Sequence, residues 1–225
     1  MFPDDFLAGV RTALPSLFGL IPFGLVAGIA AVDAGLSPLQ AIGLSFVVFA
    51  GASQLAAVDL LSQDASLAVV VVTAVVINLR MAMYSASIAP YFEAFRRRWS
   101  MACSYLLTDV SYALSITEFA EKSGTDRRWY YLGLGGAIWA VWQLTTVVGV
   151  LLGTGIPESW GVGFAVPLVF LTLLVSDVSD RPRLVAALVG GTVAVVGAAW
   201  PLNLGLVGGA LAGIVAGVAA DGGDA

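Results

Sequence analysis

The chain contains no histidine, and among its 225 residues it has one cysteine, Cys103, and one lysine, Lys122. The missing histidine excludes His-based acid–base catalysis and His metal ligation. A single cysteine excludes an internal disulfide and is a poor metal site. The chain has no Gly-Lys-Ser/Thr phosphate-binding loop, so it cannot hydrolyse ATP itself. With no nucleophile or acid–base pair in view, we expect no enzyme, cofactor, metal site or nucleic-acid partner.

Charged residues are also scarce, and this scarcity indicates whether the chain is surrounded by water or by lipid. They make up 11% of the residues against 59% hydrophobic, and the mean hydropathy is +0.94. Soluble domains carry roughly 25% charged residues. A helix needs about 20 largely apolar residues to cross the ~30 Å hydrocarbon core of a bilayer. We therefore predict an all-α, multi-pass integral protein of the cell (plasma) membrane, surrounded by lipid and with no soluble domain of any size.

Long uncharged runs indicate where the chain crosses the membrane. The run 184–220 is too long for one helix, and Pro201 disfavours helix in the residue before it, so the run divides in two. We predict one transmembrane domain, 1–225, built as a polytopic bundle of seven or eight segments. These segments are approximately 12–33, 38–61, 65–91, 99–117, 129–153, 160–177, 183–199 and 201–220.

The charges that are present are mostly acidic. Asp and Glu outnumber Lys and Arg by 15 to 10, and the isoelectric point is about 4.5. An Asp-rich, Lys-poor surface suits high salt, where dense acidic hydration keeps proteins soluble. We expect a halophilic source, which says nothing about the activity.

The basic residues gather at three points: Arg96–Arg98, Lys122–Arg128 and Arg181–Arg183. The positive-inside rule puts all three in the cytoplasm. If segment 99–117 crosses fully, however, the first two points lie on opposite faces of the membrane, and segment 38–61 raises the same conflict. We therefore predict broken or re-entrant segments here, because non-helical backbone is tolerated at membrane depth where it lines a cavity.

Two stretches in different halves of the chain have weakly similar sequence patterns. Residues 35–38 lead into apolar residues 47–49, and residues 155–157 lead likewise into 168–170. Transporters are often built from such repeats, with the site at the repeat interface. Because membrane helices are rich in Gly, the sequence leaves open whether this similarity is a repeat or chance.

Polar groups inside the apolar segments are the candidate functional residues. In the second segment, Gly51 and its small neighbours are followed by Ser53 and Gln54. Small residues next to hydrogen-bonding side chains allow close helix approach or local unwinding, and unwinding would suit a binding role, although packing is the preferred interpretation. The same pattern also fits a small-residue packing seam between helices.

The third segment contains Arg80, with fifteen uncharged residues before it and twelve after it. A charge at the bilayer centre costs ~2.5–3.5 kcal/mol on insertion scales and indicates a functional site. Tyr84 and Ser87 share the helix face of Arg80, and Asn78 lies on an adjacent stripe. The alternative is a structural arginine that snorkels to the interface or neutralises an acidic partner.

Asp109 has a similar position in the fourth segment, with ten uncharged residues before it and eight after it. Tyr105 and Tyr112 share its helix face. The carboxylate either pairs with Arg80 or takes up and releases protons during transport. The sequence does not separate these two roles.

The fifth segment adds Trp139, Trp142 and Gln143 to the polar set, followed by Thr145 and Thr146. Tryptophan at membrane depth either lines a cavity or packs against its neighbours. Packing is the preferred interpretation, because large aromatic side chains usually fill core space.

At these motifs the chain resembles the AzlC family of branched-chain amino-acid exporters. Four motifs match in order along nearly the whole chain, while the C-terminal third matches only in hydropathy and Gly content. The family often has Glu after the Asp of the fourth motif, where this chain has Val110, so no paired acid is expected there. The motifs are Gly19–Leu25, Val48–Gln54, Asn78–Arg80 with Tyr84–Ser87 and Ala89–Pro90 after it, and Leu107–Asp109.

The resemblance implies a transporter that exports leucine, isoleucine, valine or related residues such as methionine. It also implies a partner, a small AzlD-type membrane subunit. Neither the family nor this chain supplies an ATPase, so the resemblance suggests that an ion gradient drives export.

The residues suggest how such a zwitterionic substrate would bind. Arg80 offers its carboxylate a fork of donors, as would the exposed amides of a broken helix at Gly51–Gln54. Asp109 or Asn78 would accept hydrogen bonds from its ammonium group. We therefore predict a midplane site between segments two, three and four. Its residues are Gly51, Ser53, Gln54, Asn78, Arg80, Tyr84, Asp109 and Tyr112.

Two other interpretations stay open at this point. The chain could be a channel or an ion-coupled carrier for a different small solute, with Arg80 and Asp109 as its gate. It could also be a subunit that is inactive until its partner binds.

Overall fold

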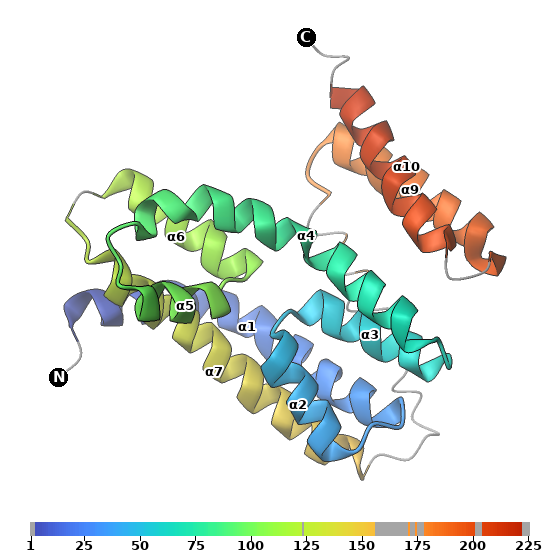
Figure 1. The fold of residues 1–225 in the computed structure, drawn as a ribbon, viewed down its shortest axis with the longest axis horizontal. Coiled ribbons are helices and arrows are strands. Elements are labelled where there is room, and N and C mark those ends of the chain that lie inside the picture. Colours follow the sequence, from blue (N-terminus) through green and yellow to red (C-terminus); the bar gives the residue numbers. More distant parts are fainter. Residues whose placement is uncertain are drawn as a thin grey trace. The chain divides into compact units, whose positions relative to one another are not determined.

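The computed structural model describes residues 3–122, 124–155, 171, 174, 178–200 and 204–221. These residues are helical and contain no strand, which confirms the all-α class. They belong to two compact units, Met1–Val166 and Pro167–Ala225 (Figure 1). Helices long and apolar enough to cross a membrane confirm the polytopic membrane fold. The four that the described residues contain are Asp4–Asp33, Leu67–Phe92, Arg127–Gly153 and Arg181–Ala199.

Two long helices, α1 (Asp4–Asp33) and α7 (Arg127–Gly153), form the frame of the first unit. Phe6 lies beside Gly133 near their first ends and Leu25 lies beside Gly149 near their last ends, so the helices run parallel. At 1.5 Å per residue each is about 40–45 Å long, more than the ~30 Å hydrocarbon core requires. Glycines at the contact let the two backbones touch directly, as small residues do between membrane helices.

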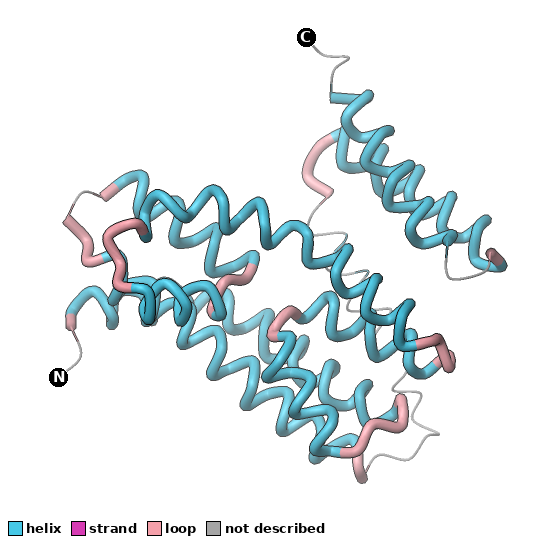
Figure 2. The backbone as a smooth tube through the Cα atoms, in the orientation of Figure 1, coloured by secondary structure: helices cyan, strands magenta, loops and turns pink. Residues whose placement is uncertain are grey.

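The predicted second segment is a broken helix. It consists of α2 (Pro38–Val48) and α3 (Gly51–Ser62), which we call the first hairpin. The break is caused by Phe49, whose φ of 37° lies in the left-handed region that ends a helix. Figure 2 shows this break as a short loop between the two helices.

The predicted fourth segment is broken as well. It consists of α5 (Arg97–Tyr105) and α6 (Asp109–Glu121), which we call the second hairpin. Thr108 starts α6 because its side chain accepts a hydrogen bond from the Ser111 amide, as a helix cap does. The pair is longer than the predicted 99–117 because its outer ends continue past the apolar run, where water solvates charged side chains. The prediction of broken segments is confirmed at both places.

Each hairpin enters the unit from one end and returns to the same end. The first lies between the last residue of α1 and the first residue of α4 (Leu67–Phe92), and Leu60 packs with Val70 there. α4 then runs to the opposite end, where the second hairpin begins and where α7 starts. The tips of the two hairpins meet between α4 and α7 (Figures 1 and 2).

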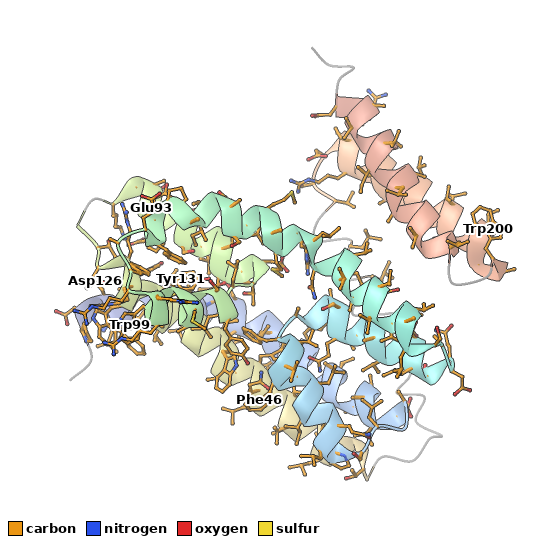
Figure 3. The ribbon with its side chains drawn as sticks, in the orientation of Figure 1. Phe46, Glu93, Trp99, Asp126, Tyr131 and Trp200 are labelled. Carbon is orange, nitrogen blue, oxygen red and sulfur yellow. The ribbon has the colours of Figure 1, made fainter. Side chains whose placement is uncertain are left out.

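Basic side chains gather at one end of this unit. At the first end of α1 the arginines stack on rings, with Arg127 4.9 Å from Tyr91 and Arg128 5.5 Å from Trp99. Trp99 and Asp126, labelled in Figure 3, mark this end. Among the described residues of the unit, the opposite end carries acidic side chains and no basic one. Those acidic residues are Asp33, Asp59 and Asp64. The basic end holds seven of the ten Lys and Arg residues, namely Arg11, Arg96, Arg97, Arg98, Lys122, Arg127 and Arg128.

This arrangement removes the conflict between the positive-inside rule and the count of spans. Because neither hairpin crosses the unit, Arg11, Arg96–Arg98 and Lys122–Arg128 all lie at one end, as the rule requires. We call this the basic end and its opposite the acidic end.

The order of elements shows a repeat inside the first unit. α1 to α3 and α4 to α6 each comprise a long helix, a four-residue linker and a hairpin, and α4 runs opposite to α1. The helices after the tips start at equivalent positions 58 residues apart, with Ala50 and Thr108 as their N-caps. Inverted repeats of this kind are common in transporters. The weak sequence similarity between 35–49 and 155–170 falls partly outside the described residues.

The second unit contains α9 (Arg181–Val196), the short 3₁₀ helix η3 (Gly197–Ala199) and α10 (Leu204–Asp221). α9 and α10 pack antiparallel, with Gly190 against Gly209 and Gly213. Asp180 caps α9 and pairs with Arg183 at 3.2 Å. These helices occupy the predicted segments 183–199 and 201–220, while most of 160–177 lies outside the described residues.

Candidate functional site

The hairpin tips meet through a hydrogen bond between side chain and backbone. The Tyr105 hydroxyl at the end of α5 donates to the carbonyl of Phe46 at 2.7 Å, and Trp139 Nε1 donates to the Tyr105 oxygen at 3.0 Å. Phe46, labelled in Figure 3, is in the last turn of α2, where carbonyls have no partner inside the helix. Tyr105 of the second hairpin therefore satisfies a carbonyl that the break in the first hairpin releases, and Trp139 of α7 fixes the Tyr105 hydroxyl.

A second polar cluster attaches the first hairpin to α7. Ser45 is fully buried, donates to Gln143 Oε1 at 3.0 Å and accepts from Trp142 Nε1 at 3.0 Å. Gln143 Nε2 donates in turn to the Ser45 carbonyl at 3.3 Å. Trp142 also packs edge-on against Phe23 at 5.2 Å. These contacts hold the tip at the middle of α7, and buried polar groups keep such positions because an unpaired one is costly.

Arg80 and Asp109 form an ion pair beside the tips. Arg80 is in the middle of α4 and Asp109 is the first residue of α6, and Nη2 lies 3.1 Å from Oδ2. Arg80 Nε and Asp109 Oδ1 are buried and have no hydrogen-bond partner among the described residues. An arginine and a carboxylate can form two parallel hydrogen bonds, so this pair retains capacity for another partner.

Asn78 connects α4 to the first turn of α3. Its Nδ2 donates to Ser53 Oγ at 3.0 Å, and the Ser53 hydroxyl donates to the Ala50 carbonyl at 3.0 Å. Gln54 is fully buried, yet neither atom of its amide has a partner among the described residues. Buried amides are almost always hydrogen-bonded, and an exception calls for a conformational or functional explanation.

The first turn of α3 carries free donors. Ala50, its N-cap, has no side chain that could accept from the first amides, whereas Thr108 caps the equivalent α6. The first amides of a helix have no partner inside it, and the helix dipole makes this end attractive to anions. The α3 terminus is thus suited to a carboxylate.

The remaining predicted residues lie on either side of these groups. The rings of Tyr84 and Tyr112 stack at 4.5 Å, and the Tyr112 hydroxyl donates to Ser87 Oγ at 2.8 Å. Gly51 faces α1 and α7 instead, because a Cβ added there would come within 2.8 Å of Phe23 and Trp142. The structure therefore joins the predicted residues as three pairs, Ser53 with Asn78, Arg80 with Asp109 and Tyr84 with Tyr112.

Sequence reasoning missed two buried serines, Ser45 and Ser111. Ser111 accepts from the Thr108 amide at 2.8 Å and donates to the Leu106 carbonyl at 3.0 Å, which closes the second tip. Its signal was present, because a Thr followed three residues later by a polar residue is a helix-start pattern. Ser45 gave no signal, since it is one small polar residue in an apolar run.

Candidate metal ligands do not cluster anywhere in the described part of the chain: it contains no group of three or more Cys, Asp or Glu residues suited to a metal ion. The charged groups of the candidate site are the Arg80 guanidinium, the Asp109 carboxylate and the dipole of α3. Such a set suits a small molecule that carries both signs of charge.

Comparison with known proteins relates the first unit to a family. A family model described as AzlC protein matches residues 15–156, which run from α1 to just past α7. The inner membrane protein YgaZ of Escherichia coli K12 is 26% identical over 94% of this chain and 87% of its own length. An uncharacterized membrane protein of Archaeoglobus fulgidus is 32% identical over 92% of both chains, and one of Helicobacter pylori 26695 is 27% identical over 85% and 86%. No solved structure matches.

Proposed function

Because this chain belongs to the AzlC family of membrane proteins, we propose that it is a transporter that exports branched-chain amino acids. Valine, leucine and isoleucine are the expected substrates, and an ion gradient is the expected driving force. The observation that carries the proposal is the pair of opposite charges, 3.1 Å apart, at the point where two broken helices meet.

The charges of the site complement those of a free amino acid. Its carboxylate is attracted to Arg80 and to the uncapped first turn of α3, and its ammonium group to Asp109. When the substrate is absent the two side chains neutralise each other. When it binds, each exchanges one opposite charge for another, so the net charge inside the membrane stays constant and no charge is left unpaired.

The apolar part of the substrate is accommodated by the rings and aliphatic groups around the tips. The rings of Phe49 and Tyr105 lie 5.8 Å apart and tilted by 35° at the junction of the two hairpins. A site with fixed charges and an apolar wall distinguishes an aliphatic amino acid from a polar one, since burying an unpaired polar group costs free energy.

The distribution of charge supports an orientation for transport. The positive-inside rule assigns the basic end to the cytoplasm. Export then runs from the basic end, past the Arg80–Asp109 pair, to the acidic end. The small AzlD-type subunit belongs to this proposal as a partner, and reconstitution with and without such a subunit tests whether export depends on it.

Efflux from proteoliposomes tests the proposal directly. The wild-type chain, with its partner where needed, should release labelled valine, and Arg80→Lys and Asp109→Asn should each abolish that release. Arg183→Lys and Asp180→Asn are matched controls, because they change a pair of the same chemistry in the second unit. If both changes at Arg80 and Asp109 left valine efflux intact, the assignment would be wrong.

A second candidate follows from the same ion pair. A channel or carrier for a different small solute could use Arg80 and Asp109 as a gate that opens when the pair separates. Competition separates the two candidates: unlabelled leucine should block labelled valine efflux only if both occupy one amino-acid site.

A further inference from the structure

A cavity of about 270 Å³ lies between α4 and α5. On α4 it is lined by Ser85, Ile88 and Phe92, which fall on one helix face at i, i+3 and i+7. On α5 it is lined by Ser100, Cys103 and Ser104. Drug-sized ligands occupy pockets of roughly 300–1,000 Å³, so a smaller molecule fits here.

The cavity extends from the basic end toward the ion pair. Its outer lining includes Glu93, in the linker between α4 and α5 at the basic end. Its inner lining includes Leu107, in the tip of the second hairpin, two residues before Asp109. The cavity thus joins the end that carries most of the cations to the edge of the candidate site.

The inverted repeat allows a comparison with the opposite end. In the 58-residue register of the N-caps Ala50 and Thr108, Ser85 corresponds to Ala27, Ile88 to Ala30 and Leu107 to Phe49. These three equivalents are 0%, 7% and 5% exposed. A Cβ on neighbouring Gly28 would meet the α7 backbone, so α7 closes this side of the first repeat. Ile88 and Phe92 on α4 are buried to a similar degree, so what distinguishes the second repeat is the gap between α4 and α5, whereas α7 covers the equivalent stretch of α1.

We propose that the α4–α5 cavity is the passage by which a small zwitterion with an apolar side chain moves between the basic end and the Arg80–Asp109 pair. This inference rests on the proposed function and extends it to new residues. The Glu93 carboxylate at the mouth attracts the ammonium group, the serine hydroxyls along the wall offer hydrogen bonds, and Ile88 with Phe92 contacts the aliphatic part. The structure is then the state open to the basic end.

Thiol labelling tests the passage. Ser104→Cys places a thiol in the cavity, and Met101→Cys places one on the same helix at a position that is 65% exposed and outside the cavity lining. The native Cys103 is fully buried but lines the same cavity, so both variants are made on a Cys103→Ser background, and that cysteine-free chain gives the background for a charged, membrane-impermeant thiosulfonate reagent. Reagent added at the basic end should label Ser104→Cys, and valine at ten times its Kd should slow that labelling about tenfold by leaving about a tenth of the sites free. Labelling of Met101→Cys should not change with valine.

A bulky substitution supplies an independent measurement. Ser104→Trp should reduce valine efflux at least about tenfold by filling the passage, while Met101→Trp should retain it, with size-exclusion profiles confirming that both proteins fold. The test requires that the unmodified chain exports valine. The passage would then be disproved if Ser104→Trp also exports valine and if valine leaves the labelling of Ser104→Cys unchanged. If the unmodified chain exports no branched-chain amino acid, the proposed function itself fails, and the passage with it.

Discussion

Replacing one glycine at the α1–α7 contact should separate the frame that holds the hairpin tips. A Cβ on Gly28 would lie 2.6 Å from the backbone nitrogen of Val150 and would also meet the Thr146 carbonyl oxygen. All of these atoms are backbone, so no side chain can rotate away. Because an ordinary carbon contact needs about 3.5 Å, the helices must move apart by about 1 Å.

The expected cost follows from this displacement. Overpacking of a well-packed interior costs typically 1–3 kcal/mol, and a 1 Å shift of α7 would also lengthen the hydrogen bonds from Trp142 and Gln143 to Ser45. Gly28→Ala should therefore lower the free energy of unfolding by about 1–3 kcal/mol and reduce valine efflux.

The same helix offers a matched control. Gly19 has no atom within 4 Å of an added Cβ, so Gly19→Ala should leave stability and efflux unchanged. Thermal unfolding in detergent, followed by size-exclusion chromatography, measures the first effect, and proteoliposome efflux measures the second. Equal melting temperatures for the two variants would refute the close packing of α1 and α7.

Three further outcomes are expected. The charge swap Arg80→Asp with Asp109→Arg should restore the folding yield that is lost in either single variant. It should not restore valine efflux, because the α3 terminus then faces a carboxylate. Restored efflux would mean that the pair is only structural. Ser45→Ala should lower stability by about 1–3 kcal/mol, since it leaves two buried partners on α7 unpaired, whereas the exposed Ser62→Ala should change melting by less than about 0.5 kcal/mol. Gln54→Leu should preserve stability, because no hydrogen bond is lost, and should impair efflux; a large loss of stability would show that the amide has a partner.

Much of this architecture could be predicted from the sequence. Arg80 and Asp109 stand out because each interrupts a long uncharged run, and pairing was one of two roles expected for Asp109. The breaks at Phe49 and Thr108 were indicated by charge, since only hairpins place all the basic points of the first unit at one end. An isolated charge in an apolar run is visible at its own position, and the placement of basic residues follows from counting them along the chain. Both kinds of information are contained in a single sequence.

The contacts that hold the tips could not be predicted. Ser45 and Gln143 are 98 residues apart, and their hydrogen bond depends on the register of α2 against α7. The packing of Gly28 was equally hidden, because the chain has 26 glycines and only some lie at a helix contact. The repeat of α1–α3 in α4–α6 preserves lengths and directions more than residues, as the equivalence of Ser45 with Cys103 illustrates.

Binding of labelled valine to the purified protein tests the central claim most directly, because it requires neither a gradient nor a known orientation. The account predicts saturable valine binding to the wild type that unlabelled leucine displaces, and loss of this binding in Arg80→Lys and Asp109→Asn but not in Arg183→Lys. Undiminished valine binding in the two site variants would contradict it, as would valine binding that leucine fails to displace.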